Sequence, residues 1–168
     1  MKTIKTTYPQ ILLLFILTLS FGCSSDDDSS DDKLTPLESE ILQLRQATGQ
    51  YLDFQIAESE GRIDVSGYVP NMGHHYLNPA LADGTFELTK PEIILYVPDN
   101  NGEMQMVAVE YSIIPDDPDN PGNPPEGFSG EDDVWYFNEM IGQWQLHVWT
   151  ILDNPDGIFA PFNPEIGD

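Results

Sequence analysis

Apolar side chains recur at helical spacing along the first part of the folded region. The period of three or four residues is found at Leu37, Ile41, Leu44, Thr48 and Tyr51. Such spacing places these side chains on one face of an α-helix, where they can be buried. The pattern therefore predicts one long amphipathic helix over residues 36–60.

Both ends of this segment carry helix signals. Thr35 and Glu38 match a capping box, and Pro36 suits the first helical position. Gly61 is a natural stop, and Gly49 is the position at which we expect the helix to bend.

The remaining chain favours β-structure. Strand-like runs with alternating or continuous apolar residues occupy Ile63–Val69, Glu92–Val97, Met104–Ile114 and Gln143–Leu152. Turn residues at Asp99–Gly102 predict a hairpin between the second and third runs. Residues 115–130 have five prolines in their first eleven positions and predict a long surface loop.

Together these patterns predict an α+β fold for a single globular domain over residues 34–168. We expect a small antiparallel β-sheet or barrel with one long N-terminal helix packed on it. A chain of 168 residues has room for one such core.

The first 22 residues read as a targeting segment. Lys2 and Lys5 precede a short apolar run at Ile11–Leu17, and small residues lie between this run and Cys23. This arrangement resembles the lipobox of bacterial lipoproteins, which implies a signal peptide over residues 1–22 and lipidation of Cys23. The alternative is an ordinary secretory signal with an incidental cysteine.

Residues 23–33 form an acidic tether rich in Ser and Asp. It resembles the surface-export signal that follows the lipidated cysteine in Bacteroidetes lipoproteins, although a plain flexible spacer has the same composition. The resemblance implies an outer-membrane, lipid-anchored protein exposed at the cell surface, with the membrane as a partner.

Charge and cysteine content exclude several classes of function. The chain has 29 acids, 6 bases and a net charge of −23, which excludes nucleic acid as a partner. Its one cysteine excludes an internal disulfide and a cysteine-based zinc site. The small-molecule or surface partner stays open.

Glu110 is the first candidate for chemistry, because it lies in the middle of a predicted strand. By alternation it shares a face with Met104, Met106 and Ala108. A buried carboxylate there needs a partner. The bases that follow residue 33 all lie outside this strand, at Arg45, Arg62 and Lys90. Histidine or a metal ion is therefore the expected partner.

The chain has three histidines. His147 is mid-strand, whereas His74 and His75 lie in an irregular, glycine-containing segment that can reach over a sheet face. Two histidines and a carboxylate compose a facial site for a divalent transition metal. We expect His75, Glu110 and His147 as ligands, with His74 and Tyr76 as additional candidates.

Ordered motifs over about residues 45–165 resemble an uncharacterised family of small secreted bacterial proteins and lipoproteins. The family patterns are MGxHY, PExxLY, VEY, LHVW and NPxGxFxxxNP, and the chain carries them at Met72–Tyr76, Pro91–Tyr96, Val109–Tyr111, Leu146–Trp149 and Asn154–Pro164. The resemblance implies that His75, Glu110 and His147 act together, while His74 falls at a variable position. Family members often carry two cysteines that this chain lacks, so no disulfide braces its C-terminal segment.

These observations favour a cell-surface domain that binds a metal or a small polar ligand through a His/Glu pocket. One alternative is a non-catalytic structural or interaction lipoprotein whose cluster is only a buried hydrogen-bond network. Another is a metal-dependent enzyme, with Glu110 as ligand or general base.

Overall fold

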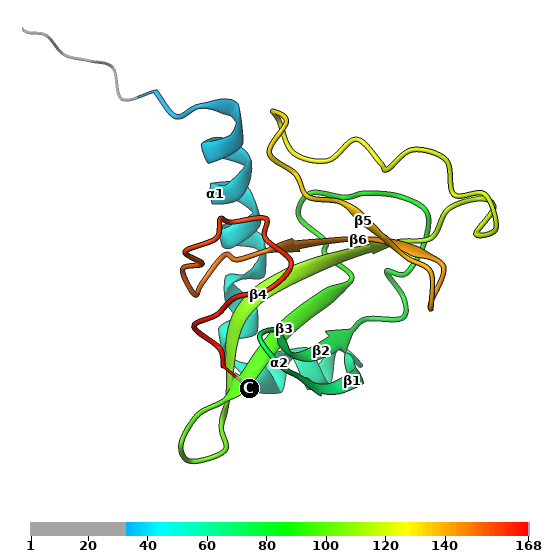
Figure 1. Cartoon of the computed structure of the whole chain (residues 1–168). Helices are drawn as coiled ribbons and strands as arrows, with labels where there is room; N and C mark the ends of the chain where they lie inside the picture. Colours follow the sequence, from blue (N-terminus) through cyan, green and yellow to red (C-terminus); the bar gives the residue numbers. More distant parts are fainter. Residues whose placement is uncertain (1–32, 168) are drawn as a thin grey trace, which may run out of the picture. The chain divides into compact units, whose positions relative to one another are not determined.

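The computed structural model describes residues 33–167. The predicted signal peptide, Cys23 and nearly all of the acidic tether lie outside the described residues. The elements are α1 (Pro36–Thr48), the 3₁₀ turn η1 (Gly49–Leu52), α2 (Phe54–Ser59), β1 (Ile63–Val69), β2 (Gly73–Leu77), β3 (Ile93–Pro98), β4 (Met104–Ile113), β5 (Tyr136–Asn138) and β6 (Gln143–Val148). Figure 1 shows the helices on one side of the sheet, so the predicted α+β class with a sheet is confirmed.

The prediction of one long helix over residues 36–60 is wrong. The capping box of Thr35 and Glu38 forms and starts α1, but α1 ends at Thr48. Asp53 has extended backbone angles, and its side chain accepts a hydrogen bond from the N–H of Gln55. A residue that caps a new helix in this way interrupts the previous one. Within residues 33–167 no helix has the length and apolar run needed to cross a membrane.

Six antiparallel strands form one sheet in the order β1-β2-β3-β4-β6-β5. The segment around His74 and His75, which we expected to be irregular, is strand β2. Gly73 permits this pairing, since it has a φ of +92° and an added Cβ would lie 2.5 Å from the carbonyl oxygen of Tyr96. The last predicted strand ends at Val148, because the N–H of Trp149 bonds to Ile158 in the C-terminal segment instead.

The sheet has two differently covered faces. On the face toward the helices, Ile41 and Leu44 of α1 pack with Tyr96 and Tyr111 in the larger apolar cluster. The opposite face carries a smaller cluster, including Leu95 and Trp149, which the C-terminal segment partly covers. Below we call these the helix face and the opposite face.

A β-bulge in β4 overturns two of the three predicted same-face neighbours of Glu110 and leaves the third, Ala108, in place. Leu95 pairs with Ala108 and Tyr96 with Met106, so Val107 is an extra residue in the ladder. The alternation of side chains shifts by one position there. Met104 and Met106 consequently pack on the helix face, while Ala108 lies on the opposite face.

The C-terminal segment is held without a disulfide. Asn71 bonds to it twice through its backbone, donating to the carbonyl of Gly167 at 2.9 Å and accepting from the N–H of Asn163 at 2.8 Å. The fully buried Asn163 side chain donates to the carbonyl of Asp153 at 3.1 Å. Buried polar groups with satisfied hydrogen bonds thus replace the covalent brace that the family resemblance associates with this region.

Leu44→Ala is expected to lower the free energy of unfolding by about 2–5 kcal/mol, because Leu44 is fully buried and its neighbours cannot close the cavity completely. Leu42→Ala is the matched control. Leu42 lies on the same helix but is 44% exposed, so about 0.5 kcal/mol or less is expected. Denaturant unfolding measures both, and equal losses would contradict the packing of α1 described above.

Candidate metal centre

Strands β2, β4 and β6 bring His75, Glu110 and His147 together on the opposite face, with β3 between β2 and β4. Glu110 in β4 and His147 in β6 are directly paired across the two strands. His75 in β2 pairs with Leu95 of β3, which in turn pairs with Ala108 of β4. All three side chains are buried and their ligand atoms lie within 4.8 Å of one another. We refer to these residues as the His/Glu cluster.

The spacing of the ligand atoms suits a small cation. The Glu110 Oε2 lies 3.4 Å from His75 Nε2 and 3.7 Å from His147 Nε2. Tetrahedral ligands about 2.0–2.1 Å from a zinc ion are separated by about 3.3–3.4 Å. Two of the three separations are therefore close to those of a coordinated ion and long for hydrogen bonds.

The cluster contains buried polar atoms that lack hydrogen-bond partners. Both carboxyl oxygens of Glu110 and both ring nitrogens of His147 are in this state. Bases with side chains directed elsewhere do not relieve it, since Arg45 donates to Thr150, Arg62 to Glu92 and Lys90 to Glu87. Buried polar groups without partners are rare and costly, and a cation between these atoms would satisfy them.

Ser66 of β1 sets the tautomer of His75. Its single hydroxyl hydrogen is donated to the carbonyl of Gly67 at 2.6 Å. The Ser66 Oγ then accepts from the backbone N–H and from Nδ1 of His75, at 3.2 and 2.9 Å. With the Ser66 hydrogen donated to Gly67, the hydrogen of His75 is on Nδ1 and Nε2 presents a lone pair toward Glu110. Metal-binding histidines commonly have such a second contact.

Burial makes the cluster electrically neutral when no cation is bound. It raises the pKa of Glu110 to about 8, with a further contribution from the charge of Glu92. It lowers the pKa of His75 to about 4 and that of His147 to about 3. At pH 7 the imidazoles are unprotonated, which is the form that binds metals.

Aromatic rings hold the orientation of His147. The rings of Tyr136 and Trp149 lie nearly parallel to it, with centroids 6.3 and 6.2 Å away. The His75 ring meets it edge-on at 5.8 Å. This packing restricts rotation of the imidazole and keeps Nε2 near the Glu110 carboxyl group.

The two additional candidates do not join the cluster, because β2 alternates its side chains. His74 lies 2.8 Å from the Asp64 carboxylate through Nδ1. Tyr76 packs edge-on against Phe54 and Tyr96 on the helix face. Cys23 lies outside the described residues.

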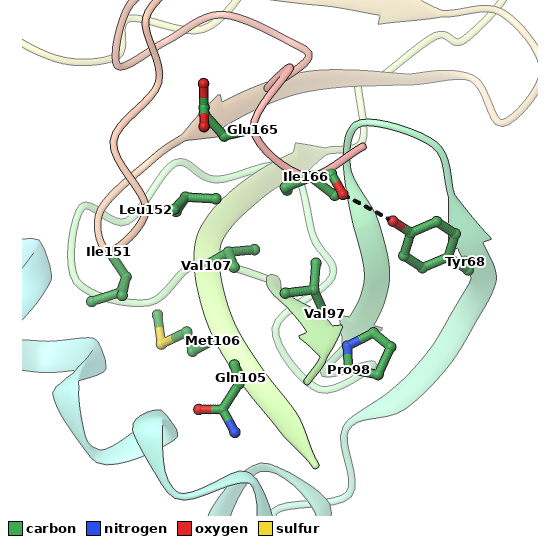
Figure 2. Close-up of a pocket in the computed structure, with 10 residues that line it drawn as sticks. All are labelled: Tyr68, Val97, Pro98, Gln105, Met106, Val107, Ile151, Leu152, Glu165 and Ile166. Carbon is green, nitrogen blue, oxygen red and sulfur yellow. Dashed lines mark hydrogen bonds between the residues drawn. The ribbon is translucent and has the colours of Figure 1, made fainter. Parts of the chain in front are cut away.

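Two pockets lie on the opposite face. One, of about 550 Å³, is lined by His75 and by residues from β1 to β5. The other, of about 790 Å³, is shown in Figure 2. Apolar side chains such as Val97, Val107 and Leu152 dominate it, and Glu165 lies apart at one end. Since it holds no histidine or cysteine, we assign the candidate chemistry to the first pocket.

No protein-family model, curated protein or solved structure matches the chain. The family resemblance inferred from its motifs therefore stays a prediction. What the structure establishes is a buried His/Glu cluster with a geometry that can hold a metal ion.

Sequence reasoning did not find Ser66 and Tyr136. Ser66 lies where the pairing of β1 with β2 is irregular, between Asp64 and Tyr68, so alternation does not place it. Tyr136 belongs to the three-residue strand β5, which is too short to produce a periodic pattern. Glu92 was also missed as a buried acid; its Oε2 accepts from the N–H of Ser112 at 3.0 Å, and burial raises its pKa to about 7.

Glu92→Gln is expected to become more stable relative to wild type as pH rises from 4.5 to 8. Below pH 4.5 Glu92 is protonated in both states; above it the unfolded chain ionises first, so wild type loses stability until about pH 7. The loss is on the order of 3 kcal/mol. Glutamine stays neutral and keeps an oxygen for Ser112. Melting temperatures across this range measure the difference, and parallel curves would contradict it.

Proposed function

We propose that this domain binds a divalent transition metal through His75 Nε2, His147 Nε2 and a Glu110 carboxyl oxygen. The observation that carries the proposal is the set of unpartnered buried atoms on Glu110 and His147, beside a His75 lone pair oriented by Ser66. A bound cation would be coordinated by one carboxyl oxygen of Glu110 and by Nε2 of each histidine. The second carboxyl oxygen of Glu110 and Nδ1 of His147 would not coordinate it.

The donor set favours zinc or another late first-row ion over magnesium or calcium. Imidazole nitrogens suit zinc, copper, iron and nickel, whereas magnesium and calcium prefer oxygen ligands. Three protein ligands leave at least one coordination position for water or a small polar ligand. Of the three ligands, His75 lines the 550 Å³ pocket, so a ligand would approach the metal from the side of His75.

Purified full-length chain, supplied with zinc, is expected to retain roughly one ion per chain and to melt at a lower temperature with chelator. His75→Gln, Glu110→Gln and His147→Gln should each lose most of the metal and the chelator effect. Ser66→Ala should bind about 10–100-fold more weakly, because it releases Nδ1 of His75. Metal analysis and thermal melts give both quantities.

His74→Gln is the matched control, because His74 neighbours His75 in sequence but contacts Asp64 instead. It should keep the metal of the wild type. A wild type that binds no metal under replete conditions, with a melt insensitive to chelator, would leave only a buried hydrogen-bond network. In such a network Glu110→Gln costs little or stabilises the fold, because glutamine is neutral at every pH, whereas burial requires Glu110 to keep its proton.

We propose that the domain is presented from a membrane by a lipid on Cys23, at the outer face of an outer membrane. The support is the position of the chain's one cysteine after a short apolar run, followed by an acidic tether.

Cys23→Ser is expected to release soluble protein or to leave uncleaved precursor. Fractionation of cells and mass spectrometry of the N-terminus distinguish these products from an acylated chain. Membrane retention that persists in the variant, with processing at another residue, would refute lipid anchoring at Cys23.

A further inference from the structure

The pocket beside the His/Glu cluster lacks charged side chains, although the protein as a whole is strongly acidic. No Asp, Glu, Lys or Arg is among its lining residues. Its apolar side chains include Val65 and Val69 from β1, and Met140 and Ile141 from the turn between β5 and β6. Met140 and Ile141 are 93% and 50% exposed, so they form an apolar rim. An apolar body of a ligand would remove this rim from water.

The wall between rim and cluster is rich in amide groups. Ser112 and Gln145 are paired across β4 and β6, one same-face step from the Glu110–His147 pair. The side-chain oxygen of Gln145 accepts from Asn138, and that of Gln143 accepts from the Ser112 hydroxyl. The two glutamine NH₂ groups therefore remain as donors, and donors bind ligands that carry oxygen acceptors.

Charge balance specifies the head of that ligand. A divalent ion held by one carboxylate and two neutral imidazoles keeps a net charge of +1 in a buried site. Burying an unbalanced charge is costly, and an anion at the open position cancels it. Phosphate-type dianions usually require Arg or Lys, and the pocket has neither. A monoanionic carboxylate fits both the charge and the amide donors.

We propose that the pocket binds an amphiphilic carboxylate, with its head on the metal and beside Gln143 and Gln145 and its apolar tail against the rim. This inference rests on the proposed metal site, and it adds a class of ligand to it. The arrangement explains why neutral amides and exposed apolar residues, rather than bases, surround the entrance.

The test uses full-length chain loaded with cobalt(II), with visible absorption as the readout of the metal site. Acetate, butanoate, hexanoate and octanoate are titrated, with octanol and octanamide as uncharged probes. The spectrum should change with every carboxylate, and affinity should rise about fourfold per added methylene until the pocket is filled. The uncharged probes should leave the spectrum unchanged.

Two variants separate head from tail. Gln143→Glu keeps an oxygen for Ser112 but places a negative charge beside the head, so all carboxylates should bind at least tenfold more weakly. Ile141→Asn should reduce octanoate affinity and leave acetate affinity unchanged. Ile151→Asn is the matched control, since Ile151 is similarly exposed at 44% but lines the other pocket.

The failures are distinguishable. If wild type gives no cobalt spectrum, or one that His147→Gln retains, the metal site and the ligand inference both fail. If cobalt binds through the cluster, two results would leave the metal site standing and refute the carboxylate pocket. One is a carboxylate affinity that is independent of chain length. The other is competition of octanol with octanoate, together with carboxylate affinities that Gln143→Glu leaves unchanged.

Discussion

A carboxyl group buried in the middle of a β-sheet, with no Lys or Arg of residues 33–167 paired with it, constrains the rest of this structure. Glu110 is completely shielded from water, and the side chains within reach are two imidazoles. In a low-dielectric setting such a group either keeps its proton or shares a cation with its neighbours. The strand order, the tautomer of His75 and the aromatic packing around His147 are all consistent with a site prepared for the second state.

The two faces of the sheet divide the work of folding and of binding. The helix face buries α1 and most of the aromatic core, which supplies the apolar burial that a domain of this size needs. The apolar residues of the opposite face form a smaller cluster, and polar groups lie beside that cluster. The costly burial of the His/Glu cluster is thereby supported by packing on the other side of the same strands.

Hydrophobic patterning predicted β1, β3, β4 and β6, and the residue types of Thr35 and Glu38 predicted the capping box, because these features depend on residues close in sequence. The bend expected at Gly49 lies where α1 ends and η1 begins, but the second break, which depends on Asp53 adopting an extended backbone, was not predicted. Strand β2, which depends on Gly73 approaching Tyr96, was not predicted either. The residues of the cluster were predicted from residue types and motifs. Their meeting depends on the register of β4 against β6 across a long loop, and local periodicity carries no information about that register.

The bulge at Val107 has a consequence for how this strand can be aligned and edited. It acts as a phase shift, so that positions before and after it follow opposite rules for which side chains face the helices. Removing Val107 would restore an uninterrupted ladder, with Met106 still facing the helices and Glu110 still on the opposite face. A related chain without this residue needs its gap placed before Ala108 to keep a carboxyl group opposite His147. An alignment that assumes strict alternation along β4 would match Glu110 to the wrong side of the sheet.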